Sequence, residues 1–85
     1  MHTVELLEAA VKLATELGFQ VRQEWLDGGG GACELKGKRW LFIDLSLNTA
    51  EQLDQVLSAL RGDPRAIDVA QLGPLRHLIS QRKAA

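Results

Sequence analysis

The sequence predicts a single α+β domain in which one helix precedes three strands and two further helical segments follow them. Three observations predict this class. Apolar residues recur at helical spacing near the N-terminus and again after residue 48, they alternate with polar residues from residue 19, and glycine or proline separates the segments. We therefore expect the order α-β-β-β-α-α over residues 1–85, with a three-stranded, mainly antiparallel sheet packed against the helices.

The first helix is expected over residues 4–17. Thr3 is a suitable N-cap, and Gly18 is a natural stop because glycine readily adopts the left-handed conformation that ends helices. One side of this helix is apolar and is formed by Leu6, Leu7, Ala10, Val11, Leu13, Ala14 and Leu17.

The first strand is expected over residues 19–26, because the apolar period changes there from helical to two. Its buried face would carry Phe19, Val21, Gln23 and Trp25. Asp27 and four consecutive glycines then end the strand, since such a run supports neither a strand interior nor a helix.

The second and third strands are expected over residues 32–35 and 39–45. Lys36, Gly37 and Lys38 form a tight turn between them, in which the glycine accommodates a positive φ. Residues 40–43 are apolar on both faces, and a strand of this kind requires cover on both sides. We expect a symmetric dimer to supply the missing cover.

The second helix is expected to begin after Asn48, which forms a capping box with Glu51, and to end at Gly62. Asp63 and Pro64 favour a short helical turn, whereas residues 66–72 are compatible with a helix or with an extended segment. A final helix is expected from residue 73, with Leu75, Leu78 and Ile79 facing inward.

The composition restricts the classes of protein. A net charge of −1 does not favour binding to nucleic acid or to an anionic membrane. The single cysteine excludes an intramolecular disulfide, and the N-terminal residues lack the pattern of a signal peptide. No apolar run reaches the roughly 18 residues that a membrane-spanning helix needs. We therefore expect a cytoplasmic protein.

The run Gly28, Gly29, Gly30 and Gly31 is the first candidate binding site. Glycine-rich loops bind phosphate when their backbone amides converge at a helix N-terminus. Here the run connects two strands, and neither the Gly-Lys-Ser/Thr motif nor the spacing of a dinucleotide-binding loop is present. A flexible connection between strands is therefore favoured over a phosphate site.

Cys33 follows this loop and is the candidate catalytic nucleophile, with His77 as its candidate base. A reactive thiol needs a nearby base or cation. The only other imidazole, His2, lies at the N-terminus, and nothing in the sequence brings either histidine to Cys33. We expect Cys33 to be a buried, structural residue.

Metal and carboxylate chemistry are not supported by the sequence. No pair of cysteine or histidine residues has the spacing of a zinc site, so we expect neither a metal nor a cofactor. Asp44, Asp63 and Asp68 would need a shared dry cleft for acid–base work, which nothing indicates. Asp44 is instead expected to hydrogen-bond the backbone of the following turn.

Positive charge gathers at Lys36, Lys38 and Arg39 and, near the C-terminus, at Arg76, Arg82 and Lys83. If these groups adjoin, they form a basic patch suited to phosphate backbones or an acidic partner. Four aromatic residues do not indicate the stacking platform of a single-strand binder, so nucleic acid is not favoured.

Three segments resemble a group of short uncharacterised bacterial proteins that share a Gly-Gly-x-Cys-x-apolar-x-Gly stretch. They are residues 30–38 (Gly-Gly-Ala-Cys-Glu-Leu-Lys-Gly-Lys), residues 41–44 (Leu-Phe-Ile-Asp) and residues 74–76 (Pro-Leu-Arg). The resemblance covers residues 17–79 and departs at Glu34, where the group has a basic residue. It implies a self-contained bacterial domain with a shared loop, and no established activity.

The sequence thus favours a non-enzymatic protein-interaction module that forms a homodimer and binds an unidentified protein partner. The motivating observation is the apolar character of both faces of the third strand. The alternatives are a thiol-dependent enzyme or redox sensor that uses Cys33, and a weak nucleic-acid binder.

Overall fold

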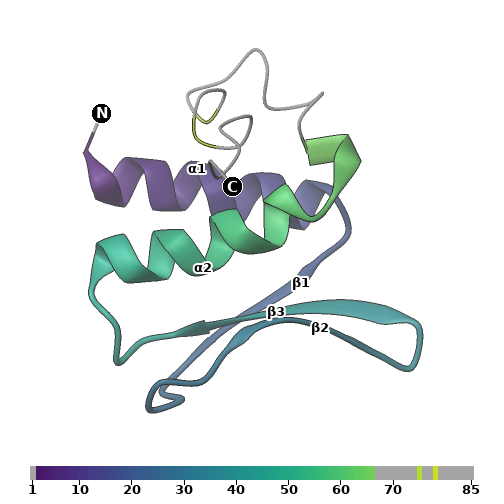
Figure 1. Cartoon of the computed structure of the whole chain (residues 1–85), viewed down its shortest axis with the longest axis horizontal. Helices are drawn as coiled ribbons and strands as arrows, with labels where there is room; N and C mark the ends of the chain where they lie inside the picture. Colours follow the sequence, from purple (N-terminus) through teal and green to yellow (C-terminus); the bar gives the residue numbers. More distant parts are fainter. Residues whose placement is uncertain (1, 67–74, 76–77, 79–85) are drawn as a thin grey trace, which may run out of the picture.

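The computed structural model describes residues 2–66, 75 and 78. It contains α1 (Thr3–Glu16), β1 (Gln20–Glu24), β2 (Gly31–Leu35), β3 (Lys38–Asp44) and α2 (Thr49–Arg61), shown in Figure 1. The predicted α+β class is confirmed. The predicted final helix, most of residues 66–72, and the inward position of Ile79 lie outside the described residues.

The three strands form a mixed sheet in the order β1-β3-β2. β2 pairs with β3 antiparallel, as expected, whereas β1 pairs with β3 in parallel. Both helices lie on the same side of this sheet (Figure 1). Since β1 and β2 flank β3, the segment of residues 25–30 that joins them must pass the C-terminal end of β3.

Each helix begins at a capping box. In α2 the Asn48 side chain accepts a hydrogen bond from the Glu51 amide at 2.9 Å, and the Glu51 carboxylate accepts one from the Asn48 amide at 3.1 Å, as predicted. In α1 the N-cap is His2, one residue before the expected Thr3, and Glu5 accepts from the His2 amide. The predicted end at Gly62 is confirmed.

The β2–β3 hairpin turns through Lys36 and Gly37, whose φ angles are 53° and 78°. Two consecutive positive φ angles in a two-residue loop define a type I′ turn, which suits the natural twist of paired strands. The prediction that glycine accommodates a positive φ here is confirmed. The turn also fixes the register, with Leu35 opposite Lys38.

The hydrophobic core lies between the two helices and one face of the sheet. It includes the predicted apolar side of α1 and, from the sheet, Leu41 and Ile43. The second helix contributes the apolar side that its helical spacing predicts, formed by Leu53, Val56, Leu57 and Leu60. Leu75 is buried against it and Leu78 packs at its margin, as expected. The expected buried face of the first strand is wrong at two positions. Gln23 is exposed, and Trp25 lies beyond the end of β1 at Glu24 and is 76% exposed.

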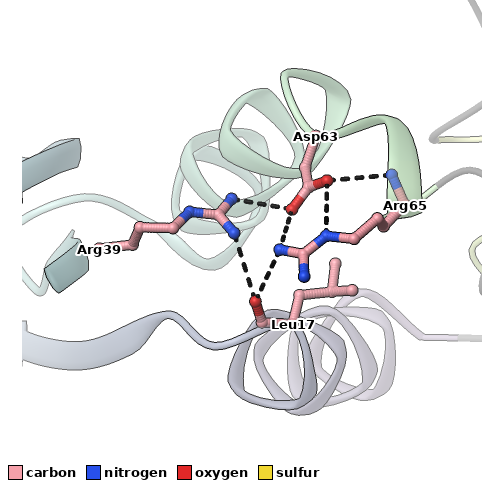
Figure 2. Close-up of polar contacts among 4 residues, drawn as sticks. All are labelled: Leu17, Arg39, Asp63 and Arg65. Atoms are coloured by element: carbon pink, nitrogen blue, oxygen red, sulfur yellow. Dashed lines mark hydrogen bonds and ion pairs between the residues drawn. The ribbon is translucent and has the colours of Figure 1, made fainter. Parts of the chain in front are cut away.

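A cluster of polar side chains links the C-terminal ends of α1 and α2 to β3 (Figure 2). The buried Asp63 carboxylate accepts hydrogen bonds from the Arg39 guanidinium at 2.8 Å and from the Arg65 guanidinium at 2.9 Å. Both arginines also donate to the Leu17 carbonyl at the C-terminal end of α1, where positive charge is favoured. The Arg39 guanidinium lies 4.0 Å from the centre of the Phe19 ring.

This cluster keeps Asp63 in its ionised form. Hydrogen bonds from Arg65 outweigh the opposing effect of burial and, together with that from Arg39, hold the pKa of Asp63 well below its usual range. Both oxygens of the Asp63 carboxylate accept hydrogen bonds from groups of the chain itself. Asp63 is therefore a structural residue that joins α1, β3 and the exit of α2.

Candidate interaction surface

The described helices leave the opposite side of the sheet uncovered (Figure 1), and we call that side the open face. Leu41 and Ile43 point into the core, so Trp40 and Phe42, which alternate with them on β3, point to the other side. The strand register places their neighbours there too: Gln20 and Arg22 from β1, and Gly31, Cys33 and Leu35 from β2.

Two aromatic rings occupy the middle of the open face. Trp40 and Phe42 stack with ring centres 5.8 Å apart and an angle of 10° between their planes, and both are half-buried. Beside them Leu35 is 54% exposed. These three side chains line a shallow hollow of about 530 Å³ together with Arg22, Glu24, Lys36 and Lys38. The open face is thus an apolar centre with a charged margin, which is the usual composition of a protein interface.

The charged margin differs from the predicted basic patch. Arg22 forms an ion pair with Glu24 at 3.0 Å, which leaves Lys36 and Lys38 as the further cations around the hollow. Arg39, which was expected to join them, points to the helix side and binds Asp63. The C-terminal group expected beside it, from Arg76 onward, lies outside the described residues.

The free edge of β2 adjoins the open face. β2 is the outer strand of the sheet, no strand of the described residues pairs with its other side, and Ala32, Cys33, Glu34 and Leu35 are all exposed. Strand edges are usually protected by charged side chains, above all lysine, by proline or by a bulge. Residues 31–35 contain neither proline nor lysine, Glu34 is their one charged residue, and the register with β3 is regular. The edge is therefore open to pairing with another strand.

The backbone groups that face this edge follow from the hairpin. In a two-residue turn the flanking residues Leu35 and Lys38 form a hydrogen-bonded pair, and such pairs alternate along an antiparallel ladder. Gly31, Cys33 and Leu35 therefore direct their N–H and C=O groups to β3. Ala32 and Glu34 direct theirs outward, to the free edge.

Cys33 lies in the middle of β2, directly opposite Trp40, and its side chain is exposed. The expectation of a buried cysteine is wrong, because β2 is an edge strand and Cys33 belongs to the face away from the core. Cys33 also borders a hollow between β2 and α2 that includes Ser58 and Ala59. His77, its candidate base, lies outside the described residues, and His2 caps α1.

The glycine loop is held by a carboxylate of the chain itself. The amides of Leu26 and Gly28 donate to Asp44, and so do the amide and hydroxyl of Ser46. Burial acts to raise the pKa of Asp44, but these hydrogen bonds lower it to about 2. The expected contact of Asp44 with the following turn is thus present, and its contact with the glycine loop is additional. The amides of Leu26 and Gly28 are therefore engaged by a carboxylate of the chain itself.

Gly30 completes this arrangement because it has no side chain. A Cβ atom added there would lie 2.8 Å from the Phe42 carbonyl oxygen and 2.8 Å from the Gln55 side-chain nitrogen. The Gln55 amide accepts a hydrogen bond from the Asp44 amide at 2.9 Å and donates to the Gly29 carbonyl at 3.0 Å. Residues 28–30 therefore pack the connection between β1 and β2 closely against β3 and α2.

Residues 2–66, 75 and 78 contain no group of three or more acidic, histidine or cysteine side chains that could hold a metal ion. Within the same residues, no helix has both the length and the apolar character that crossing a membrane requires. No protein-family model, curated protein or solved structure matches the chain. The resemblance carried by residues 30–38 therefore stays a prediction.

The apolar character of the third strand could be predicted from the sequence, whereas the side chains that share its open face were not identified. Trp40 and Phe42 are two residues apart, and this spacing alone places them on one face of a strand. Leu35 was not selected, although it alternates with Cys33 in the same way. The edge position of β2 had no signal in the sequence, because the order of strands in a sheet is not encoded in their periodicity.

Proposed function

We propose that this protein is a non-enzymatic protein-interaction module that self-associates through its sheet. The observation that carries the proposal is the adjacency of two surfaces that the described elements leave uncovered, the apolar open face and the edge of β2. An exposed edge strand beside an apolar patch is a common site of association. The carboxylates of Asp44 and Asp63 both accept hydrogen bonds within the fold, so we do not propose either of them as a catalytic group.

Leu35 and Val4 allow a matched test. Both side chains are 54% exposed, but Leu35 lies on the open face next to the β2 edge and Val4 lies on α1. Light scattering of wild-type protein at increasing concentration should show a rise in mean molar mass. Leu35→Lys should weaken the rise, because a charge would be buried in the contact, and Val4→Lys should not.

Two outcomes would count against this proposal. A wild-type protein that stays monomeric at all concentrations removes self-association. Equal effects of Leu35→Lys and Val4→Lys place the contact away from the sheet. Circular dichroism of both variants checks that the fold is retained.

The exposure of Cys33 favours one second candidate, a redox sensor or thiol-dependent enzyme. Such a role requires a thiol that ionises below its ordinary range near pH 8.5. The rate of alkylation of native protein against pH measures this directly. An alkylation midpoint near that of a free thiol would leave Cys33 without a chemical role and would support the interaction module.

We further propose that the protein acts in the bacterial cytoplasm. An exposed cysteine without an intramolecular partner suits a reducing compartment. The bacterial source rests on the resemblance carried by residues 30–38. Fractionation of cells that express the tagged chain tests the location, and recovery from an oxidising compartment would contradict it.

A further inference from the structure

We propose that two copies of the chain join edge to edge, with their β2 strands paired antiparallel and Cys33 on the two-fold axis. This inference rests on the proposed self-association and specifies its geometry. The result would be one continuous six-stranded sheet, with both pairs of helices on one side and both open faces on the other.

The outward-facing backbone groups restrict the register. Ala32 and Glu34 present their N–H and C=O groups to the free edge, so these residues must face each other in the pair. When Ala32 lies opposite the partner's Glu34, Cys33 lies opposite the partner's Cys33 and Leu35 lies opposite the partner's Gly31. All five residues of Gly31–Leu35 then take part.

Neighbouring registers are less favourable. A shift by one residue sets outward-facing groups of one strand against inward-facing groups of the other, which leaves the hydrogen bonds unmade. A shift by two in one direction sets Glu34 opposite the partner's Glu34, and like charges directly opposite each other destabilise a sheet. A shift by two in the other direction shortens the ladder to residues 31–33, unless Gly30, which lies close to Gln55 and Phe42, also enters it.

The side chains fit this register on the open face. The exposed Leu35 of each copy would lie over the partner's Gly31, and a Cβ added at Gly31 would meet nothing within 4 Å, so the space is free. Gly31 is itself paired with Phe42. Leu35 could therefore reach across the glycine to the partner's Phe42 and continue the apolar surface of both copies. Because these side chains fit those of an identical strand, we infer that the partner at the β2 edge is a second copy of the same chain.

Cys33 supplies the test. Non-hydrogen-bonded residues that face each other in an antiparallel pair have Cα atoms about 4.5 Å apart, within the range that a disulfide spans. Oxidised glutathione would accept the two electrons: the two Cys33 thiols lose their protons, one S–S bond forms between the copies, and two molecules of glutathione are released. The disulfide is a probe of the geometry, and the pairing does not depend on it.

The experiment measures the initial rate of covalent dimer formation on non-reducing gels, with full-length protein and oxidised glutathione. We expect Cys33 to cross-link roughly 100-fold faster than the Cys33→Ser/Val4→Cys variant, because pairing raises the effective thiol concentration from about 10 µM to the millimolar range. In a mixture, Cys33→Ser/Ala32→Cys and Cys33→Ser/Glu34→Cys should form the mixed dimer, as these positions face each other. Each alone should form its homodimer more slowly.

Glu34→Pro provides a second variant that leaves the thiol in place. The proline removes an N–H that points to the free edge, and it should lower the rate for Cys33 without unfolding the hairpin. Circular dichroism checks the fold.

The outcomes separate this inference from the proposed function. Slow cross-linking of Cys33 in a protein that light scattering shows to be dimeric overturns the β2 pairing and leaves self-association intact. A monomer with slow cross-linking overturns both. Rapid cross-linking that is unaffected by Glu34→Pro also overturns the paired edge.

Discussion

Gly30→Ala tests how the connection between β1 and β2 is seated at the end of β3. Gly30 has a φ of 105°, which an alanine adopts at a cost of about 1–2 kcal/mol. The new Cβ would also lie 2.8 Å from the Phe42 carbonyl oxygen. This oxygen belongs to the central strand, and the nearby Gln55 amide is held at both ends, so neither moves freely. Overpacking of this kind costs about 1–3 kcal/mol.

The expected total loss of unfolding free energy is therefore about 3 kcal/mol, a large fraction of the stability of a small domain. Gly28→Ala is the matched control, because Gly28 also has a positive φ, of 94°, and a Cβ there would meet nothing within 4 Å. It should lose only the backbone contribution of about 1–2 kcal/mol. Urea titrations followed by circular dichroism measure both values. Equal losses in the two variants would refute the close approach of Gly30 to Phe42 and Gln55.

Three further predictions concern the polar clusters. Asp63→Asn should lower the free energy of unfolding by about 2 kcal/mol, because the two guanidiniums lose their charged acceptor; an unchanged urea midpoint would show that the cluster is not stabilising. The wild-type protein should lose stability as the pH falls from about 4 to 2. The reason is that the pKa values of Asp44 and Asp63 are lower in the folded chain than in the unfolded chain, where they are near 3.8. The two ionised carboxylates therefore stabilise the fold above pH 3.8, and this contribution is lost as they are protonated. Asp44→Asn should make this loss smaller, and an equally steep loss in that variant would contradict the assignment. Gln55→Leu should speed hydrogen exchange at the Asp44 amide, which loses its acceptor, and unchanged exchange would exclude the contact.

Local features of the fold could be predicted from sequence because their causes lie within a few residues. The capping box of α2 needs Asn48 and Glu51 three positions apart, and the hairpin needs a residue such as Gly37 that adopts a positive φ. The apolar sides of the helices likewise follow from spacing alone. These elements are where the structure agrees most closely with the sequence analysis.

Features that depend on distant partners could not be predicted. The alternation of apolar and polar residues predicts that β1 is a strand. Its parallel pairing with β3, however, depends on the path of residues 25–30, which pass the C-terminal end of β3. The role of Asp44 in holding this segment depends on the same crossing. Cys33 was expected to be buried because small apolar residues usually are, and its exposure follows from the edge position of β2.

The central claim is that the unpartnered sheet surface serves self-association, and the most direct measurement is the molar mass of the wild-type protein by static light scattering. From about 1 to 300 µM, mass action should raise the mean value from the 9.3 kDa of one chain toward twice that mass. A constant 9.3 kDa over this range would contradict the claim.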